Sequence, residues 1–150
     1  MTRQTGMASD EAVIRTLLES RAAAIRAKDV AAALAPWTPE VVNYDLAPPL
    51  QYVGAEARNP DGLRGWFDTW KGPIGYDLHD FSVTAGEDLA YCYGLVHMSG
   101  TSTGGEETDV WVRQTLCLRR IEGAWKIVHE HTSVPFYMDG SDKAALDLTP

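Results

Sequence analysis

The chain of 150 residues has few cysteines and no long apolar run. Its two cysteines, Cys92 and Cys117, are too few for a disulfide scaffold and fall in strand-like segments, so we expect two reduced, buried thiols. No stretch approaches the roughly 20 apolar residues that a membrane-spanning helix needs. The first twenty residues also lack the pattern of a signal peptide. The sequence therefore predicts a cytoplasmic protein with no membrane partner.

Positive charge is also scarce. The chain has 13 Lys and Arg residues against 21 Asp and Glu residues, giving a formal net charge of −8. Because a phosphate backbone would repel such a protein, we expect no nucleic-acid partner. The sequence contains no glycine-rich phosphate loop, no Gly-x-Ser-x-Gly elbow and no Cys-x-x-Cys motif, and we expect no cofactor.

The hydrophobic content of 45% suits one domain over residues 1–150, with loose residues at 1–8 and a polar tail at 137–150. Ser9 is placed to cap a long amphipathic helix that runs to about Lys28. Asp29 can cap a short helix at 30–35, and a third helix begins at 59–61. The side chains that we expect to be buried on the long helix and the third are Leu17, Leu18, Trp66, Phe67 and Trp70.

The remaining chain has the alternating pattern of strands. Short strands are predicted at 41–45 and 51–53, and long ones at 75–84, 89–101, 108–121 and 124–134. The turns between the long strands are short enough for antiparallel hairpins. Helices followed by such a meander indicate an α+β fold, with helices on one face of an antiparallel sheet.

Two charged residues stand where chemistry is possible. Arg21 falls on the apolar stripe of the first helix, so it must pair with an acid such as Asp45 or Glu130, or else face a ligand. Asp45 ends the first strand, where an aspartate is also a common turn former.

The strand at 109–117 carries polar residues on one face. Val110, Val112 and Leu116 lie on the other face, with Gln114 as the exception there. The mixed face looks like a pocket lining, although an oligomer interface uses similar residues. Its members are Trp111, Arg113, Thr115 and Cys117.

The last strand contains the motif His129-Glu130-His131. Zinc needs more ligands than this histidine pair supplies, so we expect no metal, and hydrogen-bonding or acid–base roles are favoured. Simple alternation places His129 and His131 on one face and Glu130 on the other. A β-bulge after Ile127 would reconcile an inward Glu130 with an inward Ile127.

The whole pattern resembles the nuclear transport factor 2-like superfamily, in its SnoaL-like and ketosteroid-isomerase-like branch. The resemblance covers residues 10–136. It rests on the three-helix opening, on Val42-Asn43-Tyr44-Asp45 followed nine residues later by Gly54, and on the hairpin at 123–133. That hairpin also resembles the association domain of calcium/calmodulin-dependent kinase. The resemblance implies a cone-shaped, strongly curved antiparallel sheet around the N-terminal helix, with three helices and a central pocket.

The resemblance also implies roles for individual residues. Asp45 stands at the position of the catalytic base of ketosteroid isomerase. Arg21 and Thr115 stand where that enzyme carries its oxyanion-binding tyrosine and protonated aspartic acid. Glu130 lies where limonene epoxide hydrolases carry a pocket carboxylate.

We therefore predict a homodimer with a pocket for a small molecule, acting as an acid–base enzyme of the isomerase, cyclase or lyase type on an apolar carbonyl or polyketide-like substrate. Asp45 would be the base, with Arg113 or Arg21 holding the oxyanion and His131 as a further acid–base group. The predicted substrate-binding residues are Tyr44, Trp66, Trp111, Thr115, His129 and Glu130. The alternative is a non-catalytic ligand-binding or assembly module in which Arg21 and Asp45 neutralise each other.

The predicted dimer would form largely through the convex face of the sheet. On the strand at 89–101, large and small residues occupy opposite sides. We expect the large side to meet the partner; its members are Tyr91, Tyr93, Leu95 and His97.

Overall fold

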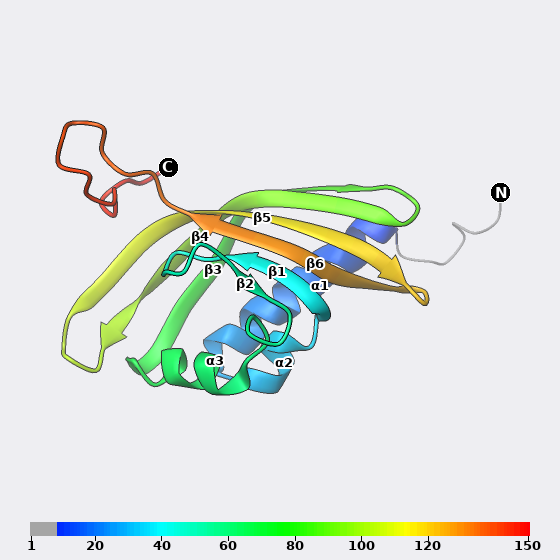
Figure 1. Cartoon of the computed structure of the whole chain (residues 1–150), viewed down its shortest axis with the longest axis horizontal. Helices are drawn as coiled ribbons and strands as arrows, with labels where there is room; N and C mark the ends of the chain where they lie inside the picture. Colours follow the sequence, from blue (N-terminus) through cyan, green and yellow to red (C-terminus); the bar gives the residue numbers. More distant parts are fainter. Residues whose placement is uncertain (1–8) are drawn as a thin grey trace.

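The computed structural model describes residues 9–150, and the segment 1–8 predicted to be loose lies outside the described residues. A strongly curved sheet wraps around the first helix (Figure 1). The helices are α1 (Asp10–Arg26), α2 (Val30–Leu34) and α3 (Pro60–Phe67). The strands are β1 (Trp37–Tyr44), β2 (Tyr52–Val53), β3 (Trp70–Ala85), β4 (Leu89–Ser102), β5 (Glu107–Ile121) and β6 (Ala124–Ser133).

The six strands form one sheet in the order β2-β1-β6-β5-β4-β3. Neighbouring strands are antiparallel, as predicted, except that β1 runs parallel to β6. This exception has a simple cause, because β1 and β6 are far apart in the chain and no hairpin dictates their direction. The sheet is therefore mixed, curved and unclosed.

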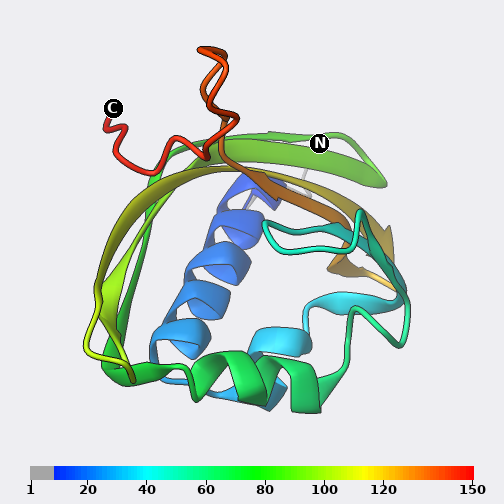
Figure 2. The ribbon, with the colours of Figure 1, turned by 60° about the vertical axis from the view of Figure 1, so that its left-hand side comes forward.

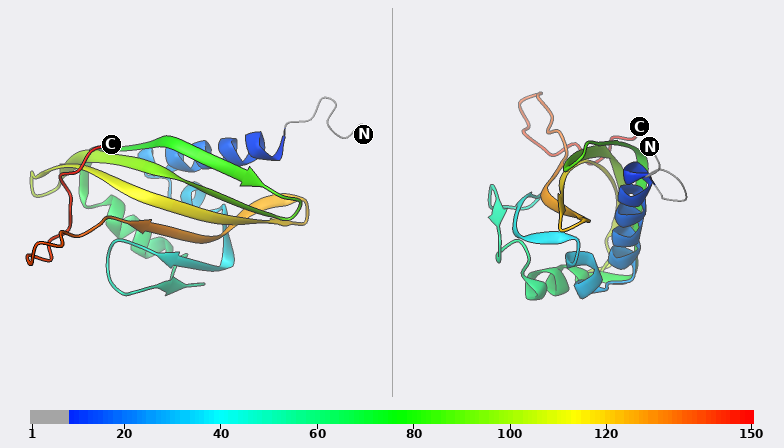
Figure 3. Two further views of the ribbon diagram at one scale, coloured as in Figure 1. Left: turned by 90° about the horizontal axis from the view of Figure 1, so that it is seen from above. Right: turned by 90° about the vertical axis from the view of Figure 1, so that its right-hand side faces the viewer.

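The helices begin where the sequence predicts. The side chain of Ser9 accepts a hydrogen bond from the backbone N–H of Ala12, and that of Asp29 accepts one from Ala32, both at 3.1 Å. Figure 3 shows α1 lying along the open side of the curled sheet. Figure 2 shows α2 and α3 together beside the last turn of α1. None of the helices described for residues 9–150 is long and apolar enough to cross a membrane.

Cations on and just after α1 bind the free edge of β3. Arg15 donates to the carbonyl of Phe81 at 2.8 Å, and Arg26 donates to that of Tyr76 at 2.6 Å. Lys28 donates to the carbonyl of Trp70 at 2.9 Å. An edge strand presents unpaired backbone groups, so these side chains both position α1 against β3 and occupy acceptors that could pair with another chain.

The core inside the sheet has two apolar clusters. One surrounds Ile14 and Leu18 near the start of α1 and includes Leu116 and Leu118 of β5. The other surrounds Ala22 and Ile25 near the end of α1 and includes Val112 of β5. Gln114 therefore falls between the two clusters on the inner face of β5.

A β-bulge after Ile127 decides which residues of β6 point inward. Leu118 pairs with Ile127, but the next residue pair is Cys117 with His129, so Val128 is the extra residue. Trp125, Ile127, Glu130 and Thr132 are buried in consequence. The sequence left open which face of this strand points inward, and the bulge resolves the question, because it turns both Ile127 and Glu130 inward.

The burial predicted for the helical stripes is correct in part. Leu18, Phe67 and Trp70 are buried, and Leu17 is half-buried. Trp66 is 36% exposed, so the prediction that it is buried was wrong. The stripe assumed that the third helix continues to Trp70, but α3 ends at Phe67 and Trp70 already belongs to β3. The Trp66 ring instead lies edge-on to Trp70 with the ring centroids 5.8 Å apart.

The tail after β6 folds back on itself. Phe136 bridges to Ala144, and the N–H of Ala145 donates to the carbonyl of Pro135 at 2.8 Å. Ala145 is buried, whereas the Met138 side chain is exposed. The tail projects beyond the end of β6, away from the sheet (Figure 1).

The inner face of β4 gives the first testable prediction. A Cβ added at Gly94 would lie 2.4 Å from the Phe81 ring, so Gly94→Ala should lower the free energy of unfolding by about 1–3 kcal/mol in a urea titration. Gly65 in α3 is the control, because nothing lies within 4 Å of an added Cβ there. Gly65→Ala should raise stability by up to about 1 kcal/mol. Equal effects of the two substitutions would contradict the packing of Phe81 on Gly94.

Candidate functional site

A network of polar side chains lies inside the sheet, between the two apolar clusters. Its centre is Glu130 on β6, which is buried together with Arg21 from α1 and Gln114 from β5. Trp37 at the start of β1 and Tyr76 from β3 complete it. The network thus joins the first helix to four strands of the sheet.

Arg21 and Glu130 form a buried ion pair. Nη1 of Arg21 lies 2.5 Å from Oε1 of Glu130, and Nη2 lies 3.5 Å from Oε2. Nε of Arg21 donates to the carbonyl of Ala33 at 3.2 Å, and the guanidinium lies 5.0 Å from the centre of the Trp37 ring. Burial, the largest single influence, opposes the charge of Arg21, but the attraction and hydrogen bond of Glu130 together with the charges of Tyr76 and Asp45 raise the pKa of the guanidinium overall. The sequence left the partner of Arg21 open, and the structure identifies it as Glu130.

Further donors surround the carboxylate. Nε1 of Trp37 donates to Oε1 of Glu130 at 3.1 Å, and Nε2 of Gln114 approaches Oε2 at 3.4 Å. The same nitrogen of Gln114 lies 3.0 Å from the Tyr76 hydroxyl and 3.3 Å from that of Thr132. Burial, followed by the negative charge of Glu130, raises the pKa of Tyr76 to about 12. The phenol is therefore protonated at neutral pH.

The interior polar residues retain slight contact with solvent. The exposed fractions of Arg21, Asn43, Tyr76, Gln114, Glu130 and Thr132 lie between 4% and 9%. By contrast, the apolar side chains of Ile14, Leu116 and Ile127 are 0% exposed. The part of the interior around Glu130 is therefore not fully sealed from solvent, and the same holds for apolar core residues such as Leu34 and Met98, each 9% exposed.

Asn43 lies in this part with an uncommitted amide. It pairs in register with Glu130 and shares the inner side of β1 with the fully buried Val41. Its side chain forms no hydrogen bond with any residue in 9–150. A buried amide without a partner is available to a ligand.

Asp45 follows the end of β1 and is exposed. Its Oδ1 accepts a hydrogen bond from the N–H of Leu46 at 2.7 Å, and Arg21 is not its ion-pair partner. Its negative charge nevertheless contributes to the raised pKa values of Arg21 and Tyr76. The carboxylate thus lies within electrostatic reach of the interior network while remaining open to solvent.

The face of β5 that we expected to line the pocket points outward instead. Arg113 and Thr115 are exposed, and Arg113 donates to the hydroxyl of Ser133 at 3.3 Å. The half-buried Trp111 ring stacks on His97 with a centroid distance of 4.5 Å. Alternation separated the two faces correctly, but Gln114, taken as the exception, is the residue that belongs with the buried network. Arg113 therefore does not converge with Arg21 and Asp45.

The two histidines of β6 also lie on the outer face. His131 is exposed and His129 half-buried, and both contact the ring of Tyr44, at centroid distances of 5.3 and 4.7 Å. Nδ1 of His129 donates to the carbonyl of Val42 at 2.7 Å. Of the predicted site residues, the structure thus brings together Arg21, Glu130 and the nearby Asp45, and separates them from the outer set. That set consists of Tyr44, Trp111, Arg113, Thr115, His129 and His131.

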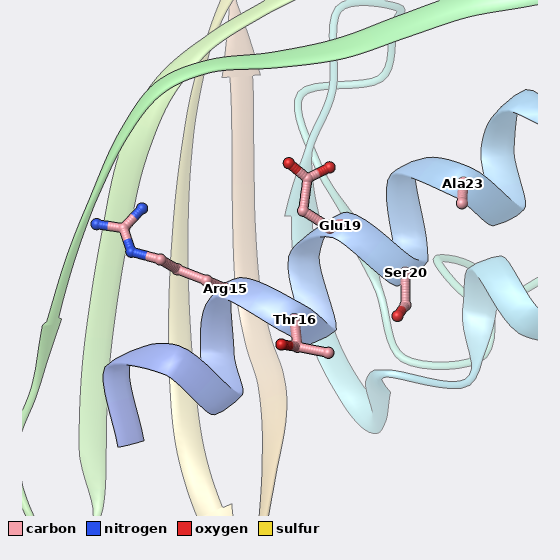
Figure 4. A pocket seen from close by; sticks show the side chains of 5 residues that line it. All are labelled: Arg15, Thr16, Glu19, Ser20 and Ala23. Carbon is pink, nitrogen blue, oxygen red and sulfur yellow. The ribbon is translucent and has the colours of Figure 1, made fainter. Parts of the chain in front are cut away.

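Two shallow hollows lie along α1, each of about 390 Å³. Figure 4 shows the first, where Arg15 and Glu19 project from successive turns of the helix. The second lies between α1 and β3 and is lined in part by Leu78 and Phe81. Neither hollow includes a residue of the Arg21–Glu130 network, so the central pocket stays a prediction. No group of three or more His, Cys, Asp or Glu residues that could hold a metal occurs within residues 9–150.

Comparison with known proteins agrees with this architecture. The model of the SnoaL-like domain matches residues 14–137. The chain belongs to the SnoaL-like family. Its fold is that of the nuclear transport factor 2-like superfamily, as the sequence predicted.

Solved structures extend the likeness over most of the chain. A nuclear transport factor 2-like protein of unknown function from Pseudomonas putida KT2440 is 31% identical, with a TM-score of 0.83 over 93% of this chain and 96% of that one. A ketosteroid isomerase-like protein from Erwinia carotovora atroseptica SCRI1043 is 21% identical, with a TM-score of 0.70 over 85% and 97% of the two chains. No curated protein matches the sequence.

Four residues of this SnoaL-like site went unrecognised in the sequence, and one of them is Trp37, to which no role was assigned. Tyr76 and Asn43 gave no signal beyond strand alternation, and Thr132 was assigned no role. Gln114 did give a signal, because a polar residue that interrupts an apolar strand face needs a hydrogen-bonding partner inside.

The ion pair gives the second prediction. Arg21→Met leaves the Glu130 carboxylate buried without its countercharge, so the free energy of unfolding should fall by about 3–5 kcal/mol in a urea titration. Adding Glu130→Leu should recover much of this loss. Arg64 is the control, because it pairs with Asp61 at 2.9 Å on the surface. Arg64→Met should cost less than about 1 kcal/mol. Similar losses for Arg21→Met and Arg64→Met would show that the pair is not a structural centre.

Proposed function

We propose that the protein binds a small, largely apolar carbonyl compound inside the sheet and catalyses acid–base chemistry of the isomerase, cyclase or lyase type, with Asp45 as the base. The proposal rests on the different surroundings of two carboxylates, Glu130 and Asp45. Glu130 is buried, and its two carboxylate oxygens already accept hydrogen bonds from Arg21, Trp37 and Gln114. Among residues 9–150 no cation forms an ion pair with Asp45, which is exposed and lies within electrostatic reach of Tyr76.

The reaction that this arrangement supports is enolisation. Asp45 would take a proton from the carbon next to the carbonyl; the electron pair of that C–H bond forms the C=C bond of the enolate, while the π pair of the carbonyl moves onto its oxygen. Return of the proton to the same or a neighbouring carbon completes an exchange or an isomerisation. The superfamily fold alone does not assign this activity, because one fold hosts many chemistries.

The non-catalytic alternative required Arg21 and Asp45 to neutralise each other. The ion pair of Arg21 with Glu130 leaves Asp45 without that role. An alternative without catalysis therefore keeps Glu130 as the structural partner and gives Asp45 no function beyond its turn.

We also propose that the protein is a homodimer joined through the outer face of the sheet. The stacked rings of Tyr91 and Tyr93 are 49% and 52% exposed in the single chain. Thr115, His131 and Tyr44 continue the row from Tyr93 across β5, β6 and β1. Exposed aromatic residues grouped on one face favour a protein partner, and a two-fold axis lets one face serve both copies.

Two free thiols support a cytoplasmic location for the protein. Cys92 is buried inside the sheet, and burial raises the pKa of its thiol to about 12. Cys117 is on the neighbouring strand but on the opposite, outer face.

Replacing the base gives the third prediction. 2-Acetylnaphthalene is the probe, and NMR in D₂O follows deuterium incorporation into its methyl group. Asp45→Asn should slow the protein-catalysed exchange by about 10²- to 10⁴-fold, because the amide cannot accept the proton. Binding of the probe and the thermal midpoint should stay unchanged, because the amide oxygen can still accept from Leu46.

Asp68→Asn is the matched control, since Asp68 is an exposed aspartate just after α3. It should exchange at the wild-type rate. Exchange by Asp45→Asn at that same rate would exclude Asp45 as the base. A wild-type protein that binds the probe without accelerating exchange would favour the non-catalytic alternative.

The outer face gives the fourth prediction. Tyr93→Lys places a charge in the proposed interface, so sedimentation equilibrium at micromolar concentration should shift from dimer to monomer. Val13→Lys changes an apolar side chain on α1 that is 42% exposed, and should leave the dimer intact. A monomeric wild-type protein would overturn this interface.

A further inference from the structure

The interior network fixes the direction of one amide. Gln114 lies between the carboxylate of Glu130 and the hydroxyl of Tyr76, and its amide nitrogen is 3.4 Å from Oε2 and 3.0 Å from the phenol oxygen. A carboxylate only accepts hydrogen bonds, so the opposite orientation would place the amide oxygen of Gln114 against it. Glu130, itself held by Arg21, therefore makes Gln114 a donor to Tyr76.

This orientation leaves the proton of Tyr76 uncommitted. The phenol oxygen already accepts from Gln114, and among residues 9–150 no acceptor takes the O–H hydrogen. Tyr76 is 8% exposed and therefore counts as buried. A nearly buried donor without an acceptor is a binding feature for a ligand oxygen.

We propose that Tyr76 is the ligand-facing hydrogen-bond donor of the interior site, that Gln114 positions it, and that the site selects a neutral carbonyl oxygen over a carboxylate. This inference rests on the proposed function, because it names the group that receives the carbonyl. The uncommitted amide of Asn43, beside Glu130 on β1, is the second donor available to that oxygen.

The choice of a neutral ligand follows from the charges around the phenol. Arg21 is neutralised by Glu130 and offers no free positive charge. The negative charges of Glu130 and Asp45 both raise the pKa of Tyr76, and that of Glu130 outweighs the opposing charge of Arg21. An anionic ligand would meet this negative potential, whereas a carbonyl needs only a donor.

Three naphthalene probes of similar size separate the effect of a neutral carbonyl from those of a negative charge and of apolar bulk. They are the ketone 2-acetylnaphthalene, the carboxylate 2-naphthoate and the hydrocarbon 2-ethylnaphthalene. We expect the wild-type protein to bind the ketone about tenfold more tightly than the hydrocarbon in titration calorimetry, and more tightly than the carboxylate. Tyr76→Phe should remove the preference for the ketone while leaving the affinity for 2-ethylnaphthalene unchanged. Tyr52→Phe is the control, since the Tyr52 hydroxyl donates to the carbonyl of Pro48.

Infrared spectroscopy of the ketone labelled with ¹³C at the carbonyl supplies a readout that a purely structural role would not change. Binding to the wild-type protein should move the carbonyl stretch to lower wavenumber, and Tyr76→Phe should reverse most of this shift. Gln114→Leu should reverse part of it, because Tyr76 then loses the donor that directs its proton. The wild-type spectrum tests the hydrogen bond even if a variant fails to fold.

The outcomes separate this inference from the proposed function. Equal affinity for ketone and hydrocarbon, or tighter binding of 2-naphthoate, would overturn the role of Tyr76 while keeping an interior site. Equal losses for ketone and hydrocarbon in Tyr76→Phe would do the same. Failure of all three probes to bind would instead overturn the proposed function, and this inference with it.

Discussion

A buried charge needs an opposite charge within reach, and among residues 9–150 the ion-pair partner of Arg21 is Glu130. The two residues are 109 positions apart, on the first helix and the last strand, so the pair forms only when the sheet has curved around α1. The apolar clusters lie on either side of it. The order of strands β1, β6 and β5, the bulge at Val128 and the position of α1 must all be correct for this contact to exist.

The same contact separates the roles of two carboxylates. Glu130 is surrounded by donors inside the protein, whereas the donor to Asp45 in the described part of the chain is the backbone N–H of Leu46. Pairs of carboxylates in unlike environments are a common way for enzymes to divide acid–base work. The ion pair also acts at a distance, because Glu130 orients Gln114 and Gln114 orients Tyr76. The Arg21–Glu130 salt bridge thus occupies the carboxylate of Glu130 and, through Gln114, leaves the O–H of Tyr76 as the donor that the interior offers.

The sequence predicted the elements well and the site less well, for identifiable reasons. Caps such as Ser9 and Asp29 are local, so the starts of the helices could be inferred from a few neighbouring residues. Alternation on β5 divided the residues into two faces, but it cannot say which face is inside when both carry polar groups. Arg113 was therefore expected in the pocket although its face points outward, and Gln114 on the inner face was given no role. Tyr76 becomes informative only when β3 and β5, with β4 between them, are placed in one curved sheet, because its contact with Gln114 depends on the whole topology.

The sheet is one layer thick at the site, so its two faces share their backbone. On the outer face, Thr115 of β5 pairs in register with His131 of β6, and His131 pairs with Tyr44 of β1. The residue that precedes each of these in the chain points inward; these inner residues are Gln114, Glu130 and Asn43. A second protein copy packed on the outer row would restrain the same strands that hold the inner donors, and it would restrain Tyr44 next to Asp45. Since the inner donors need fixed directions to favour one ligand oxygen, a rigid outer contact is a physical reason for an enzyme of this architecture to be a dimer.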